Sequence, residues 1–381
     1  MVIKMGTPVR VLHVLGSTNL GGAESRIMDL YRHIDRNRVQ FDFLVHTGEI
    51  GYFDEEITTM GGYIYHVPRF RIYNYFSYVH ELRKFFRQHY EYRAIQGHMT
   101  STAAIYLPIA KNAGIPVAIA HARSAGVDRG IKGIVTRWMR RNLPEKTDYM
   151  FTCSELAGVS VFGQKAVEEG KTVFMPNAID CRKFDYNSET RIKIRAELGL
   201  ENQYVIGHVG RFHYAKNHEY LLQVFASLCE EKKYMESGKD YALLLLGDGE
   251  GMEEAKRLSE KLGIEKKVYF AGKKSNIWDY YQAMDYFIYP SRYEGLPGTV
   301  LEAQASGLRC LMSDSICQEV IVTELVKAMS IKEDTGEWAS YVKKTEDYVR
   351  ISHQEKVAEA GFDVEGQAEK MMKFYETGNW I

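Results

Sequence analysis

Two carboxylates flank a glycine- and proline-rich turn in the last third of the sequence. Residues 289–303 read YPSRYEGLPGTVLEA, which predicts the end of a strand, a turn with Glu294 and a helix with Glu302. Free main-chain amides at the start of this helix, at Gly298 and Thr299, suit an anion such as phosphate. Carboxylates accept hydrogen bonds from hydroxyl groups, which sugars offer. Helix capping is the ordinary role of such acids, but Glu302 lies too deep in the helix for it.

Two cations follow an earlier predicted strand. Residues 207–217 read GHVGRFHYAKN, with Arg211 just after a glycine and Lys216 five residues later. Arg binds two oxygens through its planar fork and Lys acts as a point charge, so the pair can neutralise a diphosphate. A solvated surface pair is the common alternative for these residue types. The end of a buried strand fits that alternative poorly.

Two glycine-rich loops also lie between predicted strands and helices. Residues 16–24, GSTNLGGAE, contain Gly21 and Gly22 and suit either a tight turn or the close approach of an anion to a helix N-terminus, and both readings stay open. The loop lacks the Lys-Ser/Thr of a phosphate-binding Walker loop and the spacing of a dinucleotide loop. In residues 247–251, GDGEG, two acids would repel a pyrophosphate. We therefore predict a simple turn there.

Polar residues follow two predicted strands in the first half of the chain. His121 ends the run PVAIA and is followed by Arg123 and Ser124, and His98 ends the run RAIQG. Ligands of open α/β sheets bind at the carboxyl ends of strands. For His121 a catalytic and a structural role are both open, whereas a structural role is favoured for His98. Arg123, Ser124 and His98 are the candidates for contact with an acceptor.

The elements that must position these residues alternate along the chain. Short apolar strands and longer amphipathic helices repeat from residue 9 to about 180, lapse into a polar stretch at 181–203, and then restart. This pattern predicts α/β domains with doubly wound parallel sheets. At roughly 150 residues per domain, 381 residues predict two. We place them at 1–185 and 186–363.

With these motifs in this order, the chain resembles glycosyltransferase family 4, retaining transferases of GT-B fold. The resemblance rests on GGAE at 21–24, MPNAID at 175–180, the GR and KN pairs around Arg211 and Lys216, and the two glutamates with seven residues between them. The amino-acid sequences of these segments are most similar to those of bacterial transferases of exopolysaccharide and capsule assembly. The resemblance implies two Rossmann-like domains that face each other across a cleft.

The resemblance also implies roles for single residues. Arg211 and Lys216 would bind the donor diphosphate, and Gly22, with Gly21 beside it, would approach the phosphates or the transferred sugar. Glu294 would contact the donor sugar and Glu302 the ribose hydroxyls. The base would lie against the segment 272–277, which includes Asn276 and Ile277, and His121 would lie near the anomeric centre. The tail, about 364–381, would form a helix that crosses back onto the first domain.

Composition narrows the cofactors, partners and location. The chain has 49 Lys and Arg against 50 Asp and Glu, a formal charge of −1, which does not indicate a nucleic-acid partner. Residues 1–185 hold 24 Lys and Arg against 18 Asp and Glu, or +6, so the remaining residues carry −7. Without an Asp-x-Asp motif we expect no metal and no other cofactor. No signal peptide or membrane span is evident, so we expect a cytoplasmic protein.

Two basic segments carry interleaved apolar residues. Residues 69–93 hold six Lys and Arg against two glutamates, and residues 129–146 hold six against one. Such segments can lie on an anionic membrane surface, which would suit a polyprenyl-linked acceptor. Helices that simply pack their apolar face inward are an equally good reading.

The predicted reaction is the retaining transfer of a sugar from a nucleotide diphosphate sugar, UDP-sugar favoured, to a hydroxyl of a glycan or lipid-linked acceptor. The alternatives are a sugar-nucleotide epimerase of similar two-domain fold and an inactive transferase-like partner subunit. A two-domain periplasmic sugar-binding protein is disfavoured, since such a protein needs a signal peptide and no phosphate clamp.

Overall fold

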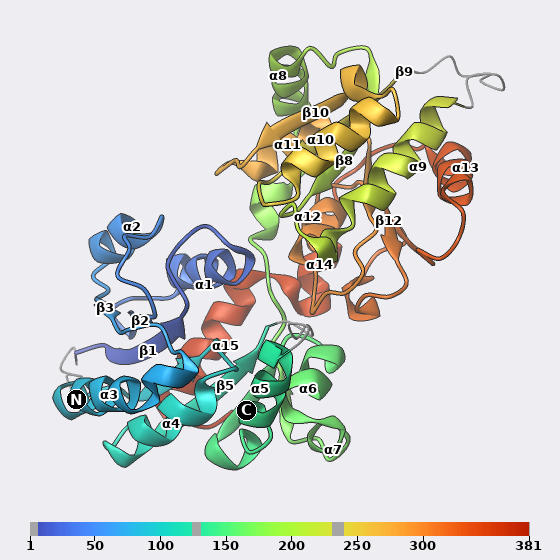
Figure 1. Ribbon diagram of the computed structural model, residues 1–381. Coiled ribbons are helices and arrows are strands. Elements are labelled where there is room, and N and C mark those ends of the chain that lie inside the picture. Colours follow the sequence, from blue (N-terminus) through green and yellow to red (C-terminus); the bar gives the residue numbers. More distant parts are fainter. Residues whose placement is uncertain (1–6, 124–130, 231–239, 381) are drawn as a thin grey trace. The chain divides into compact units, whose positions relative to one another are not determined.

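The computed structural model describes residues 7–123, 131–230 and 240–380. The chain divides into two compact units: unit 1 comprises Met1–Ala178 and Val364–Ile381, and unit 2 comprises Ile179–Asp363 (Figure 1). Residues 179–185, which we expected in the first domain, therefore belong to unit 2. The reason is main-chain pairing, because Ile179 donates to Phe362 O at 2.8 Å and forms a parallel bridge with Asp363.

Unit 1 is built on a parallel sheet of seven strands in the order β3-β2-β1-β4-β5-β6-β7. The strands are β1 (Val9–Leu15), β2 (Val39–Val45), β3 (Ile64–His66), β4 (Ala94–Gly97), β5 (Val117–Ala122), β6 (Tyr149–Thr152) and β7 (Thr172–Phe174). Central strands such as β2 and β5 are buried along their whole length, as expected of a parallel sheet with both faces covered. The buried Asp42 in β2 is neutralised by the side chain of Arg10.

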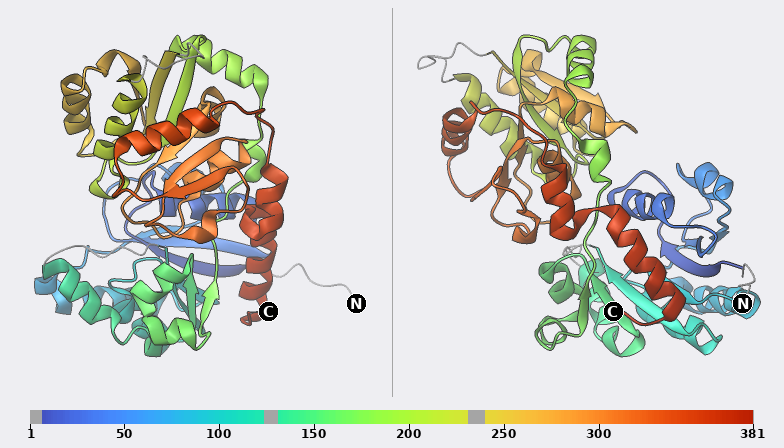
Figure 2. Two further views of the ribbon diagram at one scale, coloured as in Figure 1. Left: turned by 90° about the vertical axis from the view of Figure 1, so that its right-hand side faces the viewer. Right: turned by 180° about the vertical axis from the view of Figure 1, so that it is seen from behind.

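The helices of unit 1 form two layers. They are α1 (Gly22–His33), α2 (Asp54–Thr59), α3 (Tyr75–Gln88), α4 (Ala103–Asn112), α5 (Ile131–Arg140), α6 (Glu155–Phe162), α7 (Gln164–Glu168) and α15 (Val364–Thr377). Right-handed crossovers put α1 and α2 on one face of the sheet and α3 to α7 on the other. The C-terminal α15, red in Figures 1 and 2, packs beside α1 and against β1 and β2. Its Met371 and Phe374 belong to the apolar core of this unit.

Unit 2 repeats the architecture with six parallel strands in the order β10-β9-β8-β11-β12-β13. The strands are β8 (Gln203–Val209), β9 (Asp240–Leu246), β10 (Val268–Gly272), β11 (Tyr286–Tyr289), β12 (Arg309–Ser313) and β13 (Val326–Met329). The helices are α8 (Ser188–Leu198), α9 (His218–Glu230), α10 (Met252–Lys261), α11 (Ile277–Ala283), α12 (Gly298–Ala305), α13 (Thr335–Thr345) and α14 (Gln354–Val357). Two Rossmann-like units with parallel sheets confirm the α/β prediction. Each unit has an apolar core of its own.

The sequence pattern missed one strand and located the others. The edge strand β13 reads VKAM, and its residues are only partly buried or exposed, so no continuous apolar run marks it. Within the described ranges, no helix is both long and apolar enough to cross a membrane.

Candidate active site

Two loops of unit 2, after β8 and after β11, are tied together. Arg292 donates its main-chain amide to Ala215 O at 2.7 Å and its guanidinium to Tyr214 O at 2.6 Å. Asn217 donates its side-chain amide to Pro290 O at 3.1 Å. Among the described non-glycine residues, Asn217 alone has a positive φ, 58°, a conformation that Asn adopts more readily than most residues. The two loops therefore hold each other in place.

This arrangement brings together Lys216 and Glu294, which lie 78 residues apart in the sequence. Lys216 Nζ lies 2.6 Å from Glu294 Oε1 and also donates to the hydroxyl of Tyr289, which itself donates to Glu294 Oε1 at 3.2 Å. A side chain at Gly210 would come within 2.9 Å of His208 Nε2 and 3.3 Å of the Lys216 stem, so the glycine leaves room for both side chains. The predicted diphosphate-binding lysine and sugar-binding glutamate thus form one cluster at a strand end.

The cluster is charged and only partly buried. The side chains of Lys216 and Glu294 are 20% and 17% exposed. Burial lowers the pKa of Lys216, but Tyr289 and Glu294 raise it by more, so its pKa lies above the usual value and the ammonium stays charged. Burial also raises the pKa of Tyr289, which therefore remains a neutral hydrogen-bond donor. The cluster offers a permanent cation that a ligand can reach.

Arg211, the second predicted cation, lies in the same loop but is far more exposed. Its side chain is 68% exposed, and its guanidinium lies 3.5 Å from Glu250 in the loop 247–251. That loop is a structural support, as predicted. A side chain at Gly247 would collide with Gly210 O and one at Gly249 with Phe212 O, and both glycines have positive φ. The glycine loop therefore fixes the main chain that carries Arg211.

The second glutamate of the pair lies inside unit 2. Glu302, on α12, is 2% exposed and accepts a hydrogen bond from Tyr281 OH at 2.8 Å. The same hydroxyl lies 3.1 Å from Thr299 O, near the start of α12. Gly298 and Thr299 are the first two residues of α12, and no side chain caps this helix. Its N-terminal amides remain suited to an anion.

The predicted base-binding segment precedes and begins α11. Asn276 donates to the Asp279 carboxylate at 2.7 Å, and Ile277 is the first helical residue. Both are half-buried. Because Tyr281 lies one turn further along this helix, α11 links the segment to the buried Glu302.

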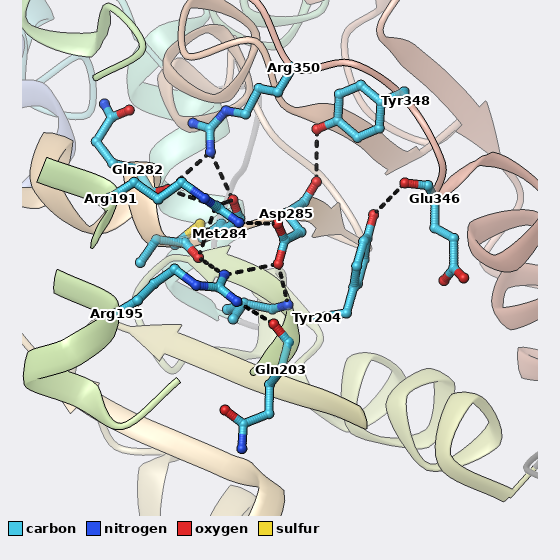
Figure 3. Close-up of polar contacts among 12 residues, drawn as sticks. Arg191, Arg195, Gln203, Tyr204, Gln282, Met284, Asp285, Glu346, Tyr348 and Arg350 are labelled. Atoms are coloured by element: carbon cyan, nitrogen blue, oxygen red, sulfur yellow. Dashed lines mark hydrogen bonds and ion pairs between the residues drawn. The ribbon is translucent and has the colours of Figure 1, made fainter. Parts of the chain in front are cut away.

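Three arginines hold the C-terminal end of α11 in place (Figure 3). Arg191 and Arg195, both from α8, contact the carboxylate of Asp285 at 2.5 and 3.0 Å. Arg350 donates to main-chain carbonyls at this end, at residues 281, 282 and 284. Cations at a helix C-terminus are favourable, and here they also fix the start of β11. The cluster holds Tyr281 and β11 in their positions, and no local motif in the sequence marks it.

The predicted residues of unit 1 lie at the carboxyl ends of β1, β4 and β5. Gly21 precedes α1 and Gly22 is its first residue. A methyl group at Gly22 would meet no atom within 4 Å, and its φ is not positive. Neither packing nor backbone conformation therefore requires glycine at this position. This favours the close approach of a ligand over a structural role.

His98 and Arg123 belong to a hydrogen-bonded chain. Arg123 Nε donates to His98 Nδ1 at 3.0 Å, and His98 Nε2 lies 3.1 Å from His13 Nδ1. Arg123 also donates to the Asn177 side chain at 2.7 Å. Both ring nitrogens of His98 are thus engaged, which favours its structural role. Ser124 lies outside the described residues.

His121 is completely buried at the end of β5. Its Nδ1 lies 2.9 Å from Gln96 Nε2, and Gln96 in turn accepts from the hydroxyl of Tyr375 on α15. Burial, with a smaller contribution from Arg123, holds the pKa of His121 well below its usual value. The ring is therefore neutral.

Several of these partners were not singled out from the sequence. Tyr289 and Tyr281 read as ordinary core aromatics, although Tyr289 stands five residues before Glu294 at a strand end. His13 lies inside an apolar strand. Nothing local connects Gln96 with Tyr375, which lie 279 residues apart.

Among the described residues, no group of three or more His, Cys, Asp or Glu side chains is arranged to hold a metal ion. The predicted cations Arg211 and Lys216 both lie in the loop after β8.

Comparison with known proteins agrees with this arrangement. Residues 20–183 match Glycosyltransferase Family 4, and residues 190–363 match Glycosyl transferases group 1. The chain is 32% identical to a putative glycosyltransferase, EpsF of Bacillus subtilis. The alignment spans 374 residues and covers 96% of each chain. It is 24% identical to the capsular polysaccharide biosynthesis glycosyltransferase CapH of Staphylococcus aureus, over 88% of this chain and 90% of CapH.

Two further likenesses are to a named relative and to a solved structure. An Escherichia coli UDP-Gal:alpha-D-GlcNAc-diphosphoundecaprenol alpha-1,3-galactosyltransferase is 25% identical over 59% of this chain and 58% of its own length. The crystal structure of Anabaena HepE in complex with UDP superposes with a TM-score of 0.75 at 17% identity, over 97% of this chain and 100% of HepE. Two matched family regions, a full-length relative and two Rossmann-like units lead to one conclusion: the chain belongs to glycosyltransferase family 4 and has the GT-B fold.

Proposed function

We propose that this transferase moves a sugar from a nucleotide diphosphate sugar, with UDP favoured, to a hydroxyl of a glycan or polyprenyl-linked acceptor in exopolysaccharide or capsule synthesis. The observation that carries the proposal is the cluster of Lys216, Glu294 and Tyr289 at the end of β11. A lone surface ion pair would have no need of the room at Gly210 or of two loops tied together. The relatives' names supply the polysaccharide and polyprenyl classes, and HepE supplies UDP.

In this reaction the donor's bond between the anomeric carbon and the diphosphate breaks, and a bond to the acceptor oxygen forms on the same face. The acceptor's proton passes to the leaving diphosphate, so atoms and charge balance. Negative charge grows on the diphosphate as it leaves. Lys216, Arg211 and the N-terminal amides of α12 would stabilise that charge, in place of a metal ion.

The sugar and the nucleoside need hydrogen-bonding partners of another kind. Glu294 would accept from hydroxyls of the transferred sugar once the diphosphate draws Lys216 away. Glu302, fixed by Tyr281, would accept from the ribose hydroxyls, and the segment with Asn276 and Ile277 would bind the base. Unit 2 would thus take the donor.

We assign the acceptor side to unit 1. Gly21 and Gly22 would allow close approach of the donor's phosphates or sugar, and His121 would act near the anomeric centre. Arg123 would hold the strand-end network in place at the acceptor. A cytoplasmic location fits a donor that is made in the cytoplasm.

A thermal-shift screen tests the donor assignment. A ligand that binds only the folded state at 100 times its Kd adds about 2.7 kcal/mol of stability, so the melting temperature rises clearly. We expect UDP and UDP-sugars to stabilise the wild type and not the Lys216→Ala variant. Release of free UDP only when acceptor is present would identify a transferase, whereas interconversion of UDP-sugars without UDP release would identify an epimerase.

A membrane surface is the second proposal, carried by exposed aromatic residues on unit 1. Near the start of α3, Tyr73 and Phe76 are 82% and 86% exposed, and on α5 Trp138 is 75% exposed. Helices α3, α4 and α5 pack side by side in one layer, so residues 69–93 and the described part of the second basic segment, 131–146, share a face of the unit. Exposed aromatics among Lys and Arg suit the interface of an anionic membrane.

Liposome flotation tests this surface. We expect the protein to float with vesicles that contain anionic phosphatidylglycerol and not with neutral vesicles. The double variant Phe76→Ser and Trp138→Ser should stay with the soluble fraction. The matched control, Val349→Ser and Ile351→Ser, removes exposed apolar residues of unit 2 and should float as the wild type does. Equal flotation of both variants would overturn the assignment.

A further inference from the structure

A buried chain of three side chains connects the C-terminal helix to His121 inside unit 1. The hydroxyl of Tyr375, on α15, donates to Gln96 Oε1, and Gln96 Nε2 faces His121 Nδ1 at 2.9 Å. Tyr375 is 1% exposed, Gln96 2% and His121 0%. At such burial these contacts are not exchanged with bulk water, so their direction matters.

The direction fixes the proton on the imidazole. An amide nitrogen only donates, so His121 Nδ1 must accept, and the single proton of the neutral ring lies on Nε2. A doubly protonated ring would point an N–H at the amide N–H of Gln96. This relay of Tyr375, Gln96 and His121 therefore favours a neutral ring over an imidazolium. It also favours the tautomer with its proton on Nε2.

The groups around His121 also favour its neutral form. His98 lies on one side, with ring centroids 5.3 Å apart, and Phe151 on another at 5.9 Å. Arg123 is the charged group that faces this cluster, and burial lowers its pKa only to about 10, so it remains a cation at neutral pH. His13, also neutral, lies beyond His98. The Met175 main chain raises the pKa of His121, but it does not form a full hydrogen bond with Nε2.

We propose that Tyr375 and Gln96 are positioning residues that hold His121 as a neutral imidazole with its proton on Nε2, so that His121 donates a hydrogen bond during transfer and does not accept the proton of the acceptor hydroxyl. The catalytic half of this inference rests on the function proposed above. The tautomer half stands on unit 1 alone. Through Tyr375, the C-terminal helix α15 would thus position His121 in addition to packing in the apolar core.

The first measurement is nuclear magnetic resonance of the full chain with nitrogen-15-labelled histidine, assigned through a His121→Asn variant. In the wild type we expect the Nδ1 signal of an unprotonated nitrogen and the Nε2 signal of a protonated one, unchanged from pH 5.5 to 8. Tyr375→Phe should give a mixture of tautomers. Gln96→Glu should move the proton to Nδ1, because a carboxylate accepts from it. A protonated Nδ1 in the wild type would overturn the inference.

The second measurement is transfer kinetics on the same variants. We expect Tyr375→Phe to lower kcat by about tenfold or more while the KM for the donor stays unchanged, because a misplaced tautomer damages the chemical step and not donor binding. The matched control is Tyr31→Phe, which removes another buried tyrosine hydroxyl of unit 1, one that donates to Met60 O at 3.2 Å. It should keep full kcat.

The two measurements separate the possible failures. If Tyr375→Phe mixes the tautomers and kcat does not fall, the catalytic half is wrong. If the wild type transfers no sugar at all, the proposed function and the catalytic half fail together, while the resonance result still decides the tautomer.

Discussion

The two candidate sites of this transferase, one in each unit, use opposite electrostatics. In unit 2, Lys216 and Glu294 are charged, paired at 2.6 Å and about one-fifth exposed. In unit 1, His98 and His121 are neutral, and each lies in a chain of directional hydrogen bonds, His98 with His13 and Arg123, and His121 with Gln96. The charged pair of unit 2 is partly exposed at strand ends, whereas the neutral His121 of unit 1 is completely buried.

The difference follows from what each site would have to bind. A diphosphate leaving group needs fixed positive charge, and Tyr289 and Glu294 keep the partly buried Lys216 charged despite its desolvation. Hydroxyl groups and an anomeric centre need directional hydrogen bonds, which buried neutral groups provide without the cost of a buried charge. The Lys216–Glu294 pair keeps each ion compensated until a ligand separates them.

The largest expected effect comes from the cation of unit 2. Lys216→Ala should lower kcat/KM by about 10²- to 10³-fold, because a fixed charge aimed at the leaving group is lost. The fold should persist, since the side chain lies at a loop and not in the core. Steady-state kinetics with the donor found in the thermal-shift screen measure the loss. Lys256→Ala, which removes an exposed lysine paired with Glu253, is the control and should keep full activity.

A single methyl group tests the glycine of unit 1. Gly22→Ala should change unfolding free energy by less than about 1 kcal/mol, because the added methyl meets no protein atom within 4 Å. If a ligand does approach this main chain closely, kcat/KM should fall by up to about 10²-fold, the scale of a small misplacement of substrate. Full activity with unchanged stability would show that unit 1 does not contact the donor there.

Arg211, the more exposed of the two cations, should matter less than the partly buried Lys216. Arg211→Ala should lower kcat/KM by about tenfold, the value of one hydrogen bond to a charged group. Because Arg211 is 68% exposed, salt should screen its contribution. We therefore expect the ratio of wild-type to variant activity to shrink as salt increases, whereas the ratio for Lys216→Ala should hardly change. Equal salt dependence would contradict the different burial of the two cations.

The sequence marks the candidate residues of unit 2 more clearly than the neutral network of unit 1. Arg211, Lys216, Glu294 and Glu302 belong to short motifs at strand ends, so spacing and residue type suffice to find them. The relay from Tyr375 to His121 joins α15 to β4 and β5, and no local pattern records such a contact. Gln96 in a buried strand and Tyr375 in an amphipathic helix each have an ordinary reading. The arginines around Asp285 also lack a local sequence pattern, because they donate hydrogen bonds to main-chain carbonyls of residues far away in the sequence.

The fold shows a similar limit. Central strands read as apolar runs because both faces of a parallel sheet are covered, and these runs located twelve of the strands within a few residues. The edge strand β13 has too few buried side chains to stand out. The boundary between the units also depended on one long-range pairing, Ile179 with Asp363, which composition does not encode.

A further comparison concerns acid stability, through buried neutral histidines, of which His13 in unit 1 and His218 in unit 2 are examples. Burial lowers the pKa of His13 in unit 1 to about 3 and that of His218 in unit 2 to about 2. Between these values and the ordinary 6.5, the unfolded chain binds a proton that the folded chain does not. Stability should therefore fall as pH drops below 6.5, by up to about 1.4 kcal/mol per pH unit for each histidine.

Hydrogen exchange followed separately in the two units measures this slope, since two units need not unfold together. His218→Phe should flatten the acid dependence of unit 2 alone, and the new ring can keep the stacking on Phe212, where the centroids lie 4.0 Å apart. His13→Phe should flatten that of unit 1 but also remove the hydrogen bond to His98, so its stability at neutral pH should fall as well. An unchanged slope in either variant would mean that the histidine is protonated in the folded state, and for His13 it would contradict the neutral network of unit 1.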